Sequence, residues 1–120
     1  MEKRLEELLM GMVACNSVNP AWEGGPGEGD VCRYIRTFLS STGLTPEIHE
    51  VKDGRTNVVC TVPGTGNAPS LMLNAHVDVV GVEGMDEPFT LQRKGDRLYG
   101  RGAYDMKGSV AVMLVLAEYF

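Results

Sequence analysis

The sequence predicts an α/β protein in which helices and strands pack in layers. Two amphipathic helical patterns come first, several short strand patterns follow, and an apolar helix closes the sequence. Helices and strands in this order are typical of layered α/β architectures around one core. The chain has 120 residues, of which 43% are hydrophobic and 22% are charged. This composition is that of a globular protein, and the length corresponds to one domain or less.

The first two helices are predicted from apolar residues that recur at spacings of three and four, which places them on one helix face. The first stripe consists of Leu5, Leu8, Leu9, Met12 and Val13. This helix is expected to end before Asn19-Pro20, because a residue that precedes proline is disfavoured in the helical conformation. A glycine-rich loop covers residues 23–29. The second stripe consists of Val31, Tyr34, Ile35, Phe38 and Leu39, with Gly43 as the expected cap.

The hydrophobic period changes after the second helix. Residues 45–51 and 57–62 flank Asp53-Gly54, a dipeptide suited to a tight hairpin turn, and predict two antiparallel strands. The nearly continuous apolar run 71–75 predicts a strand buried on both faces of a sheet, with His76 at its end. A small hairpin is expected over residues 89–99, and a final helix follows Asp105 and runs to Phe120.

Charge and apolar content exclude several classes of protein. The net charge of −5 argues against a nucleic-acid partner, since phosphate binding requires clustered Lys and Arg. The longest apolar run, residues 110–117, is too short to span a bilayer, and the charged amino terminus does not resemble a signal peptide. We therefore expect a cytoplasmic protein without a membrane partner. Cys15, Cys32 and Cys60 are odd in number and fit neither a disulfide framework nor a paired-thiolate zinc site, so we expect reduced thiols.

The first candidate site is His76-Val77-Asp78, directly after the predicted buried strand. Residues i and i+2 of an extended segment point the same way, so the Asp78 carboxylate can hold one imidazole nitrogen while the other faces a metal ion. This short pattern is also common in histidines with a purely structural role. His49, which lies between Glu47 and Glu50 in a polar strand, is expected to be a solvated side chain.

The second candidate site is Asp105, which follows Gly100-Arg101-Gly102 and precedes the last helix. The two glycines allow a sharp turn of the backbone. A carboxylate at a helix amino terminus is either a simple cap or a metal ligand, and both remain open here. Arg101 and Lys107 are either charge partners of Asp105 or solvated side chains.

The two candidate sites lie in the segments SLMLNAHVDVV and LYGRGAYDMKG. Together these segments resemble motifs of a zinc-dependent family that includes acetylornithine deacetylase, succinyl-diaminopimelate desuccinylase, aminoacylases and the glutamate-releasing carboxypeptidases. The resemblance also extends to residues 17–20, to the Gly-Glu-Gly of residues 27–29, and to residues 57–59 and 87–89, and so covers nearly the whole chain. It implies a three-layer α/β/α catalytic domain like that of zinc exopeptidases. Residues 1–120 would be its amino-terminal part, truncated in the last helix, with no second domain visible.

The resemblance also implies roles for individual residues. His76 would be a terminal zinc ligand and Asp105 the carboxylate that bridges two zinc ions, with cobalt or manganese as alternatives. Asp78 would be the catalytic-site residue that holds the His76 ring. The peptide bond that follows the bridging aspartate, here Asp105–Met106, is often cis in such enzymes. Ala75 and Val79 depart mildly from the usual family pattern.

The activity that the resemblance implies is metal-dependent hydrolysis of an amide bond by a zinc-activated water. The substrate would be a small N-acyl amino acid or a peptide. The general-base glutamate and the other ligands would lie beyond Phe120, so we expect the isolated chain to be inactive. A homodimer of the complete enzyme stays open. The alternative is a non-catalytic fragment or a binding module that retains the front of the fold.

Overall fold

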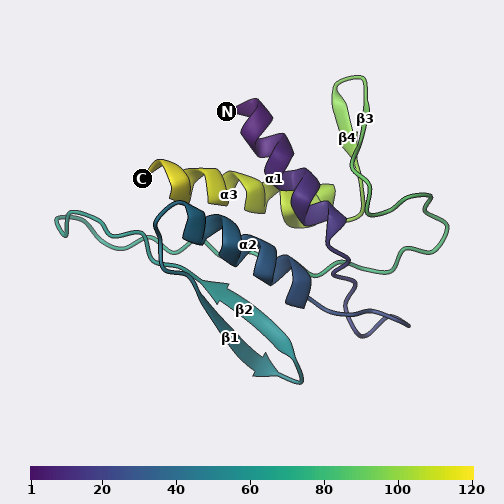
Figure 1. Ribbon diagram of the computed structural model, residues 1–120, viewed down its shortest axis with the longest axis horizontal. Coiled ribbons are helices and arrows are strands. Elements are labelled where there is room, and N and C mark those ends of the chain that lie inside the picture. The colour runs from purple at the N-terminus through teal and green to yellow at the C-terminus, as the bar shows by residue number, and fades with distance from the viewer.

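A computed structural model describes all residues, 1–120, and combines three α-helices with two β-hairpins (Figure 1). The α/β class predicted from the sequence is confirmed at this level. The helices are α1 (Glu2–Ala14), α2 (Gly29–Ser41) and α3 (Gly108–Tyr119), with a short π-helical turn, η1 (Ala103–Lys107), immediately before α3. The strands are β1 (Glu47–Lys52), β2 (Arg55–Val59), β3 (Gln92–Lys94) and β4 (Arg97–Tyr99).

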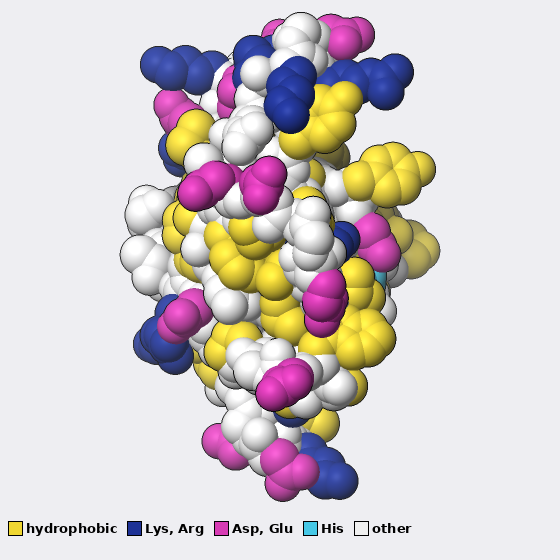
Figure 2. All heavy atoms as spheres, turned by 90° about the vertical axis from the view of Figure 1, so that its right-hand side faces the viewer, with side chains coloured by type: hydrophobic (Ala, Val, Ile, Leu, Met, Phe, Trp, Pro, Cys, Tyr) yellow, Lys and Arg dark blue, Asp and Glu magenta, His cyan; other side chains and the backbone are white.

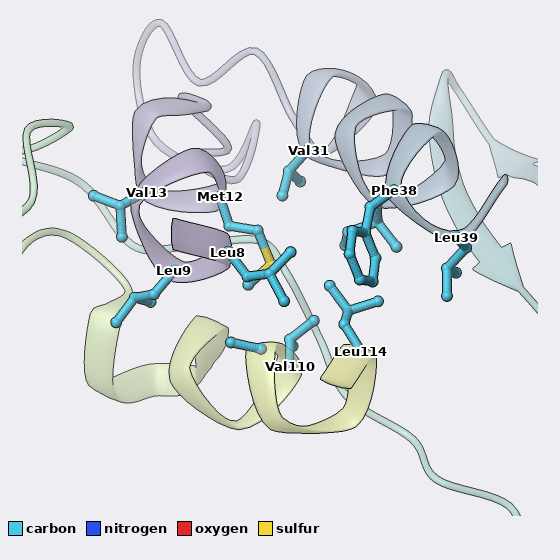
Figure 3. Close-up of a cluster of buried hydrophobic side chains, with 11 residues drawn as sticks. Leu8, Leu9, Met12, Val13, Val31, Phe38, Leu39, Val110 and Leu114 are labelled. Atoms are coloured by element: carbon cyan, nitrogen blue, oxygen red, sulfur yellow. The ribbon is translucent and has the colours of Figure 1, made fainter. Parts of the chain in front are cut away.

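The hydrophobic core lies between the three helices, with α3 beside both α1 and α2 (Figures 1 and 3). The stripes predicted for the first two helices supply most of it, and Met12, Val13 and Val31 are fully buried. Val110, Ala111 and Leu114 of α3 close the cluster from the third side. None of the three helices has both the length and the apolar character needed to cross a membrane.

The predicted hairpins are both present. In β1–β2, Asp53 and Gly54 have φ angles of 50° and 77°, as the tight turn requires, and the hairpin packs against α2 (Figure 1). The shorter β3–β4 hairpin lies at the opposite end of the molecule from β1–β2 (Figure 1), where Arg93 forms an ion pair with Glu6 of α1. Lys and Arg side chains gather at that end of the molecule, whereas acidic side chains are spread over the face below it (Figure 2).

The prediction of a buried strand at residues 71–75 is wrong. This segment belongs to neither sheet, and Leu71 and Met72 are more than four-fifths exposed. A central strand needs a hydrogen-bonded neighbour on each side, and neither hairpin lies alongside this segment. Regular pairing begins later, at a parallel bridge between Val18 and Val79. The three-layer arrangement therefore remains a prediction.

The three cysteines are free thiols. Cys32 is buried where α2 meets the β1–β2 hairpin, with its Sγ 3.5 Å from the Thr56 carbonyl oxygen, and Cys15 and Cys60 are partly buried. Burial raises the pKa of each thiol, so these side chains behave as small apolar residues.

Candidate metal site

The segment that carries His76 and Asp78 is fixed by pairing with residues 17–19, just after α1. The backbone N–H of Val79 donates to the Ser17 carbonyl oxygen at 3.0 Å, and the backbone N–H of Asn19 donates to the Val79 carbonyl oxygen at 2.9 Å. The buried Ser17 hydroxyl donates to the Val77 carbonyl at 2.7 Å. These bonds hold residues 77–79 extended, which is the condition for His76 and Asp78 to face the same side.

The turn that carries Asp105 packs directly against the same segment. Gly102 is buried with a φ angle of 78°, and a Cβ atom there would lie 2.4 Å from Cγ1 of Val79. Only glycine combines this backbone conformation with so close an approach. The Arg101 amide donates to the Pro88 carbonyl at 2.7 Å and ties down the other side of the turn. The two sequence motifs thus meet at Gly102 and Val79.

His76 joins the two motifs through its two ring nitrogens. Nε2 lies 3.0 Å from Oδ1 of Asp105, although the residues are 29 positions apart in the chain. Nδ1 lies 3.2 Å from the backbone carbonyl oxygen of Asp78 and 3.3 Å from its Oδ1. The predicted proximity of His76 and Asp105 is therefore observed, and Asp78 lies on the opposite ring nitrogen, as expected from the i, i+2 spacing.

The charges at the site stabilise one another. Although partial burial opposes it, hydrogen bonds to Asp78 and Asp105 raise the pKa of His76. Burial also works against ionisation of Asp78, but the hydrogen bond from Asn19 and the charges of His76 and Arg55 lower its pKa. The Asp78 side chain is 26% exposed, against 79% for Asp105. Asp78 is thus a fixed, ionised partner of the ring, and Asp105 is open to solvent.

Two polar residues that the sequence analysis did not assign to the site approach Asp78, and a third holds one of them. Asn19 donates from Nδ2 to Oδ2 of Asp78 at 2.7 Å. Arg55, at the start of β2, lies 3.9 Å from the same oxygen and forms a two-pronged ion pair with the buried Glu28. The signal available in the sequence was the resemblance at residues 17–20 and 27–29, which includes Asn19 and Glu28 without giving either a role.

Lys107 is neither a charge partner of Asp105 nor solvated, so both predicted alternatives for it are wrong. Its side chain is fully buried, and Nζ donates to the carbonyl oxygens of Met12 at 2.9 Å and Cys15 at 3.1 Å. Burial lowers the pKa of Lys107 to about 8. The lysine therefore donates to two carbonyl oxygens at the end of α1, of which the Met12 oxygen also accepts the Cys15 backbone N–H, and it fastens the Asp105 turn to that helix.

Asp105 is not a simple helix cap. The residue at the N-cap of α3 is Lys107, no side chain caps this helix end, and the Asp105 carboxylate faces His76 instead. The Asp105–Met106 peptide bond is cis, which confirms the expectation drawn from the resemblance.

The donor atoms at the site fit zinc in type and spacing. Imidazole nitrogen and carboxylate oxygen are common zinc ligands, and bonds of about 2.0–2.1 Å in a tetrahedral site place neighbouring ligand atoms about 3.3 Å apart. The 3.0 Å between His76 Nε2 and Asp105 Oδ1 is close to that value. No group of three His, Cys, Asp or Glu side chains in the chain is arranged to hold a metal ion. These residues therefore offer two ligands, with Asp78 behind the ring.

Comparison with known proteins yields both a family and individual relatives. The profile of the family described as "Peptidase family M20/M25/M40" matches residues 72–120, which contain His76, Asp78 and Asp105. A protein of Staphylococcus aureus strain MRSA252, named probable succinyl-diaminopimelate desuccinylase, is 35% identical over 118 residues. The chain belongs to the M20/M25/M40 peptidase family.

Two further relatives of this M20/M25/M40 chain carry related names. A probable succinyl-diaminopimelate desuccinylase of Staphylococcus epidermidis is 38% identical over 92 residues, which are 73% of the chain and 22% of the relative. A succinyl-diaminopimelate desuccinylase of Rhizorhabdus wittichii is 34% identical over 118 residues, which are 92% of the chain and 29% of the relative. The S. aureus match covers 95% of the chain and 27% of that relative.

The chain thus spans about a quarter of the length of the curated relatives it matches. Peptidases and desuccinylases both hydrolyse amide bonds, so the family resemblance is to amidohydrolases. Enzymes of the M20 family are generally metal-dependent.

Proposed function

We propose that these residues form part of a zinc-dependent amidohydrolase in which His76 and Asp105 bind metal and Asp78 orients the His76 ring. The observation that carries the proposal is the 3.0 Å approach of His76 Nε2 to Asp105 Oδ1, with Asp78 at the opposite ring nitrogen. A carboxylate, a histidine and a metal ion in line are a common arrangement in zinc enzymes, since the carboxylate fixes the tautomer and raises the basicity of the ligand.

Each of the three side chains has a separate task in this proposal. Asp78 keeps the proton of the neutral His76 ring on Nδ1, where two acceptors from Asp78 lie within 3.3 Å, and so leaves the Nε2 lone pair available as a ligand. The exposed Asp105 carboxylate can present both oxygens and bridge two metal ions, as the family resemblance implies. Zinc in such sites supplies polarisation of the scissile carbonyl and a bound water with a pKa near neutrality.

The proposed substrate is an N-acyl amino acid or a small peptide, cleaved in the cytoplasm. Desuccinylase relatives favour an acyl amino acid, and the peptidase family to which the chain belongs favours a peptide. We further propose that residues 1–120 correspond to the amino-terminal part of a three-layer α/β/α catalytic domain. Structural and catalytic zinc sites use at least three protein ligands, so we infer that two ligands alone bind zinc weakly and give no turnover.

The test is hydrolysis of N-succinyl and N-acetyl amino acids and of dipeptides by the purified protein at its full natural length. We expect activity that is lost on chelation and restored by added zinc, and we expect none from residues 1–120 alone. Activity that survives exhaustive chelation would contradict the metal-dependent mechanism. Zinc-loaded protein that binds these compounds without cleaving any of them would favour the alternative, a binding module.

A further inference from the structure

On the side away from His76, the Asp78 carboxylate is approached by Asn19 and Arg55, and Arg55 is in turn paired with Glu28. We propose that Asn19 and the Glu28–Arg55 ion pair are positioning residues for Asp78, and through it for the His76 ring. Asn19 and Arg55 both approach Oδ2 of Asp78, at 2.7 and 3.9 Å, whereas Oδ1 lies 3.3 Å from Nδ1 of His76. The two carboxylate oxygens therefore have separate partners, which fixes the rotation of the carboxylate.

The orientation of the Asn19 amide is itself determined by the structure. Its Oδ1 accepts the backbone N–H of Ala21 at 2.9 Å, so the NH₂ group must face Asp78. The Asn19 backbone is bonded to Val79, one residue beyond Asp78, and Gly25 lies so close that a Cβ atom there would be 2.3 Å from the Asn19 carbonyl oxygen. Asn19 is thus a rigid donor rather than a mobile surface amide.

The Glu28–Arg55 pair adds a fixed positive charge. Glu28 is 7% exposed and lies at the start of α2, and a buried carboxylate of this kind needs a charged or hydrogen-bonding partner. Arg55 supplies this partner with a two-pronged contact that leaves its guanidinium little freedom. The pair therefore brings the β1–β2 hairpin to Asp78 and sets the distance of a positive charge from Oδ2.

The expected consequence is a bias in the neutral His76 ring. With Asp78 fixed, Nδ1 has two held acceptors, whereas the acceptor at Nε2, Asp105, is 79% exposed and can turn to solvent, so we expect the proton on Nδ1. The importance of this bias for catalysis rests on the proposed function, in which Nε2 binds metal. The bias itself does not, because it exists in the metal-free chain.

The first experiment is nitrogen-15 NMR of histidine-labelled, metal-free chain at a pH where both rings are neutral. The chain contains two histidines, so His49 serves as an internal reference. We expect His76 to be mainly protonated on Nδ1 and to shift toward a tautomer mixture in Asn19→Ala and in the double variant Glu28→Gln/Arg55→Met. Asn67→Ala, and Glu6→Gln/Arg93→Met at the ion pair between α1 and β3, are the matched controls and should leave His76 unchanged.

The second experiment is zinc binding by titration calorimetry to the same variants and to the unmodified sequence, all made in the protein at full natural length. Partners that orient a metal ligand typically change affinity by about 10–100-fold, and we expect a loss in this range for the two test variants and none for the controls. If Asn19→Ala does not fold, Asn19→Ser replaces it, because a serine hydroxyl is too short to reach Asp78.

Unchanged His76 signals and unchanged zinc affinity in folded test variants would overturn the positioning role. A tautomer shift without any zinc binding to the unmodified protein would support the positioning role and contradict the proposed function instead.

Discussion

His76 and His49 form two histidine–carboxylate pairs that are similar in local sequence but differ in their surroundings. In each pair the carboxylate is two residues away from the histidine. The His76 side chain is 51% exposed and the His49 side chain is 53% exposed. His49 contacts Glu47 at 3.0 Å within the single strand β1. His76 contacts Asp78 in its own segment and Asp105 from a distant turn, and Asp78 is itself held by Asn19.

Neither a nearby carboxylate nor partial exposure distinguishes His76 from His49. The difference lies in long-range contacts, since Val79 packs on Gly102 and pairs with residues 17–19. These contacts bring a second carboxylate to His76 and fix the first. The predictions below change the contacts of His76, the corresponding contacts of His49, or the packing that holds the Asp105 turn, each against a matched control.

The largest effect is expected when the two histidines are exchanged for alanine. In the protein at full natural length, His76→Ala should lower kcat/KM for an N-acyl amino acid by more than the roughly 100-fold upper range for outer partners of a metal. His49→Ala should leave it unchanged. Equal losses in the two variants would remove the distinction between the histidines.

Gly102→Ala should move Asp105 away from His76 and leave it with a single carboxylate, as at His49. A left-handed alanine costs about 1–2 kcal/mol and overpacking about 1–3 kcal/mol, so we expect a destabilisation of about 2–5 kcal/mol in urea unfolding. Gly66 has a similar φ angle of 81° with open space around it, so Gly66→Ala should cost only the conformational part. Equal losses would mean that the contact with Val79 is unimportant.

Asp78→Asn tests the partner on the other ring nitrogen. The amide is nearly isosteric, so the fold should persist while zinc affinity or turnover falls about 10–100-fold. Glu47→Gln makes the same kind of change beside His49 and should alter neither quantity. Zinc affinity and kcat that remain unchanged in Asp78→Asn would leave Asp78 with a structural role alone.

The smallest effect is expected at Lys107, which fastens the Asp105 turn to α1. Lys107→Met keeps much of the side-chain volume but removes a donor from the Met12 carbonyl, which retains the Cys15 backbone N–H, and leaves the Cys15 carbonyl without a partner. An unsatisfied buried polar group costs about 1–3 kcal/mol, and thermal or urea unfolding should show a loss in this range. Lys3, 91% exposed on α1, is the matched control, and Lys3→Met should change stability by less than about 0.5 kcal/mol. A stability loss no larger than that of the control would contradict the anchoring role.

Much of the local structure could be predicted from the sequence because its causes are local. The helical stripes of α1 and α2 and the turn at Asp53-Gly54 follow from side-chain spacing and backbone preference. The apolar run 71–75 was misassigned because a buried strand depends on neighbours that spacing does not reveal.

In the candidate site, too, the features with local causes could be predicted and those that depend on distant contacts could not. The i, i+2 relation of His76 and Asp78 is local and was predicted, and the proximity of Asp105 came from the resemblance of the two motifs. The roles of Asn19, Arg55 and Lys107 could not be predicted, because each depends on which distant backbone or carboxylate the fold brings within reach. Lys107 in particular is expected from the sequence to be a charge partner of Asp105 or a solvated side chain, yet it is fully buried.

The most direct test is the position of zinc in crystals of the zinc-loaded protein at full natural length, located by anomalous scattering at the zinc edge. The account predicts an ion within about 2.0–2.2 Å of both His76 Nε2 and an Asp105 carboxylate oxygen, with Asp78 still on Nδ1. An ion at His49 and Glu47, or fully loaded protein with no ion at His76, would contradict it.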